Sequence, residues 1–207
     1  SVPLNSLVVL KDGPIKTISD LKGKKVGFSV GGFEEALLSG MLQKYNLNMS
    51  DVDLVNINFS LSPSLIAKKV DAVIGAFRNF ELNQMDIVNH PGRAFYPEEH
   101  GVPTYEELIY IANQKNKKNP LFDKFFSAIQ KATLTIVNDP VSTWKDFSSF
   151  RKGLDDELNK RAYKDTIPRF ALRPQAHDLK TYTNFSNFLK RKGIIKKITK
   201  VETFAKP

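Results

Sequence analysis

The motif with the most definite chemical meaning is Gly27-Phe28-Ser29-Val30-Gly31, which spells the G-x-S-x-G of a nucleophile elbow. An elbow exposes its serine on a strand-to-helix turn, where a histidine can activate the hydroxyl for attack on an acyl group. Here Ser29 falls inside a strand pattern, and two glycines separate it from the next helix. None of His90, His100 and His177 is flanked by a residue that would orient a base. A serine hydrolase is therefore an alternative and not the leading hypothesis.

Polar and aromatic residues also collect where predicted strands end. Gly31 and Gly32 follow one strand and lead into a helix beginning Phe33-Glu34-Glu35, so free N–H groups would face the usual ligand position of an open α/β sheet. Another strand ends in Phe77-Arg78-Asn79-Phe80-Glu81, which joins aromatic, cationic, amide and acidic groups. Such a mixture is typical of a small-molecule site. The spacing fits equally well an alternative with core aromatic residues and solvated charges.

The residue inventory removes several kinds of chemistry. The 207 residues include no cysteine, which excludes disulfide scaffolds, cysteine zinc sites, iron–sulfur clusters and thiol catalysis. His100 follows Glu98 and Glu99, but adjacent side chains rarely point at one ion. The chain also lacks a G-x-x-x-x-G-K phosphate loop and the glycine spacing of a dinucleotide site. We therefore predict no metal, no cofactor and no catalytic residue.

The net charge of +9 is concentrated near the end of the chain. Basic residues without an acid between them are Lys190, Arg191, Lys192, Lys196, Lys197 and Lys200. Basic side chains suit the negative end of a helix, which we expect to run from about Lys180 and to stop at Gly193. Because stacking aromatics and groove-binding motifs are missing, we predict a solvated helix end and no nucleic-acid partner. A membrane surface is the alternative.

Strands alternate with helices in the first half of the chain. Strands are predicted over residues 4–11, 25–30, 54–59, 71–77 and 107–112, and helices over residues 33–45 and 62–69. This order is typical of an α/β fold with a mostly parallel sheet. The remainder is predicted to be helical, with helices opening at Asn119-Pro120 and Asp139-Pro140. The apolar runs are strand-sized, well short of the about 20 residues that span a bilayer.

The same segments carry a resemblance to a known family. Residues 3–11 and 20–27 resemble the middle region of type II periplasmic solute-binding proteins. Residues 31–38, 56–59, 71–81 and 103–108 are similar to the branch that binds the pyrimidine precursor of thiamine for ABC importers. That branch is related to the eukaryotic pyrimidine synthases of thiamine biosynthesis. The similarity runs in register from Ser1 to about Asp139.

The resemblance implies an α/β fold of two lobes with mostly parallel sheets, joined by a hinge. Residues 24–108 would form the second lobe. Residues 1–23 and 109–207 would form the hinge and the remaining, mostly helical part of the first lobe. The family has further strands and helices before the segment that matches Ser1, so the chain is expected to lack the N-terminal part of an incomplete first lobe.

The resemblance also implies a ligand site. Its expected residues are Gly31, Gly32, Phe33, Glu34, Asn58, Phe59, Phe77, Arg78, Asn79 and Glu81. The Glu81 carboxylate would accept hydrogen bonds from an aminopyrimidine, and Phe77 or Phe80 would flank the ring. Arg78 stands where relatives are expected to have an aromatic residue, which would favour a phosphorylated or carboxylated molecule.

The implied function is the substrate-binding component of an ABC importer. Its ligand would be a hydroxymethyl- or aminomethyl-pyrimidine, with another small solute such as a sulfonate as the alternative. The related synthases rely on a cysteine-rich motif, so this cysteine-free chain is expected not to be an enzyme. The expected partner is a membrane permease. The chain is expected to be a monomer, periplasmic or extracellular and membrane-associated, with its signal segment absent.

Overall fold

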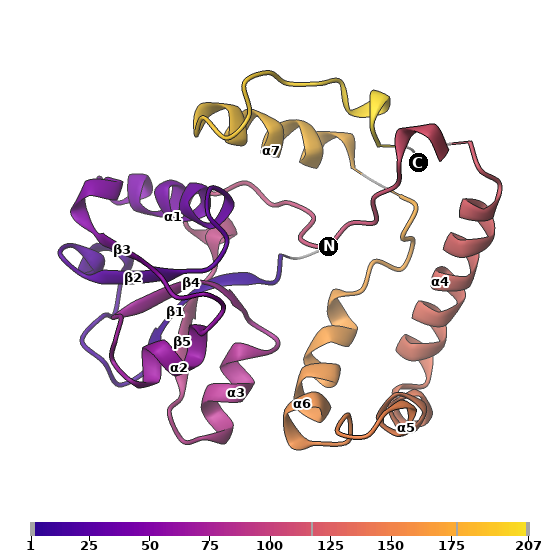
Figure 1. The fold of residues 1–207 in the computed structure, drawn as a ribbon, viewed down its shortest axis with the longest axis horizontal. Coiled ribbons are helices and arrows are strands. Elements are labelled where there is room, and N and C mark those ends of the chain that lie inside the picture. Colours follow the sequence, from indigo (N-terminus) through magenta and orange to yellow (C-terminus); the bar gives the residue numbers. More distant parts are fainter. Residues whose placement is uncertain (1–2, 117, 177, 206–207) are drawn as a thin grey trace.

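The computed structural model describes residues 3–116, 118–176 and 178–205. Two parts lie side by side (Figure 1). Residues 3–106, called the sheet unit, contain every strand of the described chain. Residues 119–169, called the helical unit, contain α4 (Leu121–Asn138), α5 (Pro140–Phe150) and α6 (Glu157–Thr166). The helix α7 (Leu179–Arg191) follows and lies near α1 of the sheet unit.

The sheet has five strands in the order β3-β2-β4-β1-β5. They are β1 (Asn5–Leu10), β2 (Lys25–Phe28), β3 (Asp53–Asn56), β4 (Ala72–Phe77) and β5 (Gly92–Phe95). β2 is parallel to β3 and β4, whereas β1 is antiparallel to β4 and β5. The α/β class is confirmed, but the sheet is mixed and not mostly parallel. Because β1 starts opposite the end of β4, the chain enters the sheet at the edge where the parallel strands finish.

Helices cover both faces of this sheet. Residues of β1 alternate between two cores, as the two-residue period of a strand requires. Leu7 and Val9 pack with α1 (Phe33–Lys44), and Val8 packs with α2 (Leu61–Ile66) and with Met85 of α3 (Glu81–Ile87). Residues 5–21 therefore belong to the sheet unit, whereas the predicted boundary of the second lobe lies at residue 24.

The strand predicted over residues 107–112 is wrong. Residues 107 and 108 form a bend, and the segment pairs with no strand in the described chain. Its apolar side chains are exposed: Leu108, Ile109, Tyr110 and Ile111, at 57–88%. A run that is apolar on both faces is typical of a strand buried inside a sheet, and such a strand needs neighbours. β5 and α3, in contrast, form where no element was predicted.

The helices predicted from residues 119, 139 and about 180 are confirmed as α4, α5 and α7. The helical unit nevertheless buries little. On α4 only Thr133 is buried, whereas Leu121 and Phe125 of its apolar residues are exposed. Phe150 of α5 is 81% exposed. In the described chain, no helix has the length and apolarity to cross a bilayer.

At Gly75 in β4, the Glu34 carboxylate approaches the backbone more closely than any side chain does at another described glycine. The φ of +103° at Gly75 is unfavourable for residues with a side chain, and a Cβ there would collide with the Glu34 carboxylate. We expect Gly75→Ala to destabilise the fold by about 3 kcal/mol, because conformational strain and overpacking add.

Gly23→Ala is the matched control for this prediction. Its φ is +72°, but a Cβ there would meet nothing within 4 Å, so only the strain of about 1 kcal/mol is expected. Urea unfolding measures both variants. Equal losses would show that the Glu34 carboxylate does not restrict Gly75.

Candidate functional site

The predicted site residues come from three loops at one edge of the sheet. These loops follow the parallel strands β2, β3 and β4, so their strand ends point the same way. Phe28 pairs with Asn56 at the ends of β2 and β3. The Phe59 N–H donates to Ser29 Oγ at 3.1 Å, which ties the first two loops together. The structure therefore brings loops 29–34, 57–59 and 77–81 to the edge expected for a ligand site.

Ser29 has a positional role in this arrangement. Its hydroxyl accepts the Phe59 N–H, and no described histidine contacts it. His100 instead shares a 2.8 Å hydrogen bond with Tyr45 Oη, and burial followed by the charge of Lys44 lowers the pKa of its ring. His177 lies outside the described residues. The part of the chain that is described thus shows no serine–histidine pair.

The loop after β3 holds an exposed aromatic ring in an unfavourable backbone conformation. Asn58 and Phe59 have φ values of +47° and +62°, and Phe59 is 74% exposed. Left-handed backbone is uncommon for a bulky residue and costs about 1–2 kcal/mol. The Asn58 N–H donates to Asn56 Oδ1 at 3.0 Å, which supports the turn. A strained turn that presents a ring to solvent is a candidate ligand contact.

Glu81 is the first residue of α3, directly beyond β4. Its Oε2 accepts the Phe77 N–H at 2.6 Å, and Oε1 accepts no hydrogen bond from another described residue. Burial raises the pKa of this carboxyl, and the bond from Phe77 opposes that shift. Phe80 lies beside it and is 37% exposed. A fixed carboxylate oxygen near aromatic rings can accept an N–H from a planar ligand.

At the start of α1, the predicted contacts are partly occupied by the protein itself. The Gly32 N–H donates to Glu35 Oε2 at 2.6 Å, and Gly32 has a φ of +82°. The Phe33 ring packs edge-on against Tyr105 at 5.6 Å between centroids. Gly31 is exposed. This loop therefore presents the backbone of the exposed Gly31 to a ligand, rather than side chains.

Glu34 and Arg78 are buried, and the side chain of each hydrogen-bonds backbone groups. Glu34 is 4% exposed, and its Oε2 accepts the Ser29 N–H at 2.7 Å. The Arg78 guanidinium forms a two-point pair with Glu98 at 2.7 and 3.0 Å. It also donates to the carbonyls of Leu4 and Asn5 at 3.3 and 2.8 Å. The Arg78 charge is thus paired with Glu98 inside the protein, and the expected contact with an anionic ligand stays a prediction.

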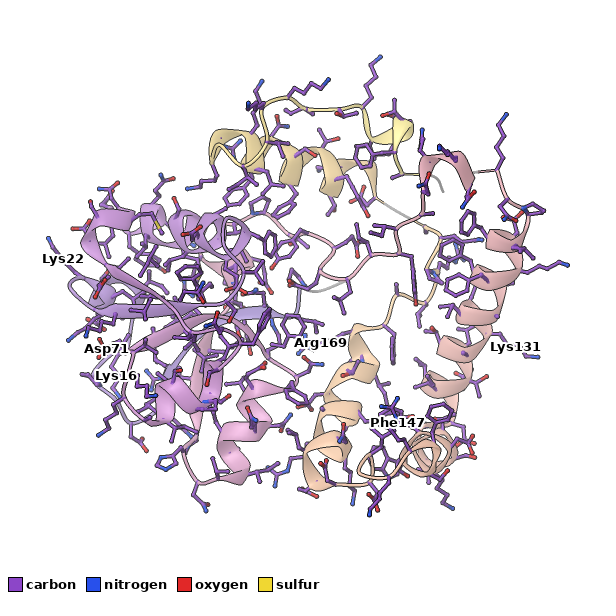
Figure 2. All side chains as sticks on the ribbon, in the orientation of Figure 1. Lys16, Lys22, Asp71, Lys131, Phe147 and Arg169 are labelled. Carbon is purple, nitrogen blue, oxygen red and sulfur yellow. The ribbon has the colours of Figure 1, made fainter. Side chains whose placement is uncertain are left out.

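Asn79 joins the site to the helical unit. Its Nδ2 donates to Thr166 Oγ1 at 2.8 Å, while its Oδ1 is buried without a partner in the described chain. Arg169 lies at the end of α6 beside the sheet unit (Figure 2). Its Nε donates to Asp165 O at 3.2 Å, and it makes no ion pair with a described residue. Sequence reasoning missed Arg169 and Thr166, because only the folded chain places α6 at this edge.

Other regions offer less chemistry. Two surface hollows of about 570 and 460 Å³ contain none of the predicted site residues. They are lined by Ser127, Gln130, Lys131, Leu134, Thr135, Asn138 and Asp139, and by Gly101, Val102, Pro103, Asn184, Asn187 and Arg191. Among the described residues, no three histidines or carboxylates gather as metal ligands.

Comparison with known proteins supports the thiamine-related assignment. The profile described as NMT1/THI5 like matches residues 1–143. A Haemophilus influenzae protein named as a thiamine biosynthesis protein is 47% identical over 206 residues, which are 99% of this chain and 66% of that protein. A Halalkalibacterium halodurans formylaminopyrimidine-binding protein is 28% identical over 140 residues, 67% of this chain and 42% of that protein. The chain thus spans about two thirds or less of these relatives.

Solved structures confirm the solute-binding-protein fold. The alkanesulfonate-binding protein SsuA of Xanthomonas axonopodis has a TM-score of 0.70 at 16% identity, covering 98% of this chain and 70% of that one. The periplasmic SsuA of Escherichia coli has a TM-score of 0.62 at 14% identity, covering 99% and 65%. At these identities the likeness concerns fold alone.

The comparisons correct one prediction. The chain was expected not to be an enzyme, but several relatives are named as enzymes. A Schizosaccharomyces pombe protein, 26% identical over 208 residues (93% of this chain, 58% of that protein), is named 4-amino-5-hydroxymethyl-2-methylpyrimidine phosphate synthase. These names contradict the expectation that the chain is not an enzyme.

The buried Glu34 carboxyl predicts a pH dependence of stability. Burial raises its pKa above the ordinary 4.5, against the opposing bond from Ser29. The folded state then keeps this proton to higher pH than the unfolded state, so ionisation costs stability as the pH rises above 4.5. Each unit of difference between the folded-state and unfolded-state pKa corresponds to about 1.4 kcal/mol in the free energy of unfolding.

We therefore expect Glu34→Gln to gain stability relative to the wild type as the pH rises from about 4.5 to 7. Urea unfolding at several pH values measures the difference between the two proteins, in which the other titrating groups cancel. A difference that stays constant across this range would contradict the prediction.

Proposed function

Because the chain belongs to the NMT1/THI5-like family, we propose that it binds a thiamine pyrimidine precursor as part of the substrate-binding component of an ABC importer. The ligand would be a hydroxymethyl- or aminomethyl-pyrimidine held at the sheet edge. The observation that carries this proposal is the Glu81 carboxylate, which Oε2 fixes on the Phe77 N–H and whose Oε1 accepts no hydrogen bond from another described residue. The name of the Halalkalibacterium halodurans relative supports the same ligand class.

Aminopyrimidines match this chemistry. Their exocyclic amine donates, and a carboxylate accepts without a donor of its own. Phe59 and Phe80 supply exposed rings at the same edge for contact with a planar ligand. Arg78 contributes indirectly in this proposal, because its buried pair with Glu98 leaves it committed to the protein. A membrane permease and a periplasmic or extracellular location would accompany an importer role.

We also propose that a further segment completes the first lobe beside the helical unit. The chain spans 66% of the Haemophilus influenzae relative, and the apolar side chains of residues 108–111 are exposed on a segment that pairs with no strand of the described chain. An exposed apolar segment of this kind gains stability when neighbouring elements cover it. The part of the Haemophilus influenzae relative outside the match, about a third of that protein, is of sufficient size and would carry further ligand contacts.

Calorimetry with 4-amino-5-hydroxymethyl-2-methylpyrimidine tests the ligand. The titration uses this chain and the same chain extended by the segment of the Haemophilus influenzae relative that it does not cover. Binding by either supports the proposal, and binding by the extended chain alone assigns contacts to the added segment. Tight binding of an alkanesulfonate with no response to the pyrimidine would overturn it.

Glu81→Gln should weaken pyrimidine binding by about 1–3 kcal/mol, because the amide cannot replace the carboxylate as acceptor at both oxygens. Calorimetry measures the dissociation constant. Glu99→Gln, which changes an exposed acid of the same unit, is the control and should bind as the wild type does. An unchanged affinity for the Glu81 variant would remove this residue from the site.

Phe59→Asn should separate stability from binding. Asparagine tolerates the left-handed backbone better than phenylalanine, so we expect a gain of about 0.5–1 kcal/mol in unfolding free energy. The exposed ring is lost, so pyrimidine affinity should fall. Urea unfolding and calorimetry report the two effects. Lower stability would show that the ring supports the fold, and unchanged affinity would exclude a ligand contact.

A further inference from the structure

Three side-chain pairs connect the sheet unit to the helical unit. They are Asn79 Nδ2 to Thr166 Oγ1 at 2.8 Å, Asn83 Nδ2 to Asp165 Oδ2 at 2.7 Å, and Arg161 Nη1 to Asp86 at 2.6 Å. In the described chain, these are the side-chain hydrogen bonds between residues 3–106 and α4–α6. We propose that these six residues, called the polar latch, set the affinity of the proposed pyrimidine site by holding the two units closed. The proposal rests on the proposed function.

The spacing of the pairs makes them successive contacts between two helices. Residues 79, 83 and 86 are separated by four and three positions, which places them along one side of α3 and the turn before it. Their partners follow in the opposite order, from Thr166 back to Arg161. The site end of the latch is Asn79, and Arg161 and Asp86 form the far end. Contacts remote from the ligand can therefore hold the helical unit beside the strand ends.

The composition of the latch allows it to open. The side chains of Arg161 and Asp86 are 38% and 59% exposed, so water can replace their ion pair. The buried residue of α6 is the small Ala162, which contributes little apolar area. A neutral hydrogen bond changes an equilibrium by only about two- to tenfold once exchange with water is included. Such an interface closes without becoming permanent.

The side-chain oxygen of Asn79 opposes closure at the site end, although its side-chain nitrogen makes one of the three pairs. Thr166 Oγ1 donates to the Ala162 carbonyl at 2.6 Å, so it must accept from Asn79 Nδ2. This requirement fixes the amide, and Asn79 Oδ1 is left buried without a partner in the described chain. Opening would return this oxygen to water. One cost therefore opposes three favourable pairs, and the closed and open arrangements lie close in free energy.

Affinity follows from the closed fraction. A ligand that binds one arrangement has an apparent dissociation constant equal to the intrinsic constant divided by the fraction of molecules in that arrangement. Residues of the latch that never touch the ligand thus change its affinity. Asn83 and Asp165 are the best probes, because they lie in the middle of the latch and their amide and carboxylate have nearly the same shape.

The test exchanges these two side chains. N83D places two carboxylates opposite each other and should open the latch. The pair N83D/D165N restores an amide donor to a carboxylate across the interface, and it should recover closure in part, because the Asn83 Nδ2 bond to the Asn79 carbonyl at 3.1 Å is not restored. D165A, which removes the acceptor, is the second single variant. K164A, at an exposed position of α6, is the control and should match the wild type.

Distance measurements report closure without a ligand. The chain has no cysteine, so Lys69→Cys and Lys131→Cys accept a pair of spin labels on the two units without interference. N83D and D165A should lengthen or broaden the distance distribution and weaken pyrimidine binding about fivefold to thirtyfold. The double variant should reverse both effects, which a general loss of folding would not do.

Each outcome decides the proposal. An unchanged distance distribution in N83D and D165A, or no recovery in the double variant, would overturn the latch. Altered distances with unchanged pyrimidine affinity would show that closure does not set affinity, and would also overturn it. If the distances respond as expected but no protein binds the pyrimidine, the latch holds the units together and the proposed function has failed instead.

Discussion

The buried Arg78 side chain fixes the point where the chain enters the sheet, and the loops of the site are placed relative to that point. Its guanidinium pairs with Glu98 at two points and donates to the carbonyls of Leu4 and Asn5. It also lies over the Tyr96 ring, 3.9 Å from the centroid. Breaking such a buried pair costs about 3–5 kcal/mol, because the remaining charge has no partner.

The other side of the same entry segment is held by Glu107. Its Oε2 accepts the N–H groups of Leu4 and Asn5 at 3.1 and 2.9 Å, and also the Tyr105 hydroxyl at 2.9 Å. Burial and the Glu107 charge raise the pKa of Tyr105, so this hydroxyl stays a donor. The backbone N–H and C=O groups of Leu4 and Asn5 are therefore hydrogen-bonded by side chains that lie about 75 and 100 residues further along the chain. Such contacts fix β1 against β4 and explain why the sheet is mixed.

Carboxylates play the same structural part at two other strand ends. Glu34 accepts the Ser29 N–H after β2, and Glu81 accepts the Phe77 N–H after β4. Burial raises the pKa of both groups, because a charge is less well solvated there than in water. Because these carboxylates bind backbone N–H groups, loops with few regular hydrogen bonds keep a defined shape at the proposed site.

Local patterns predicted the elements, and long-range pairs decided what the residues do. The period of apolar residues was sufficient for α4, and the strand–helix alternation was sufficient for β2, α1 and β4. The role of Arg78 was not predictable, because Glu98 lies 20 residues away and a run of mixed polarity shows no pairing. The contact between Asn79 and Thr166 spans 87 residues and has no local signal. Antiparallel β1 and β5 depend likewise on pairing that only the folded chain establishes.

Apolar area is divided unequally between the two units, and this division limits how they cooperate. Among the described residues, the buried hydrophobic side chains lie at or before Tyr105 with three exceptions, which are Ala162, Phe188 and Val201. The sheet unit therefore has a core of its own, whereas the helical unit has amphipathic helices with almost none. The helical unit depends on contacts at its borders, among them the three pairs with α3 and the turn before it. A helical unit with little core of its own, attached to the sheet unit through a few polar contacts, has a low barrier to rigid-body movement, which is what the proposed latch requires.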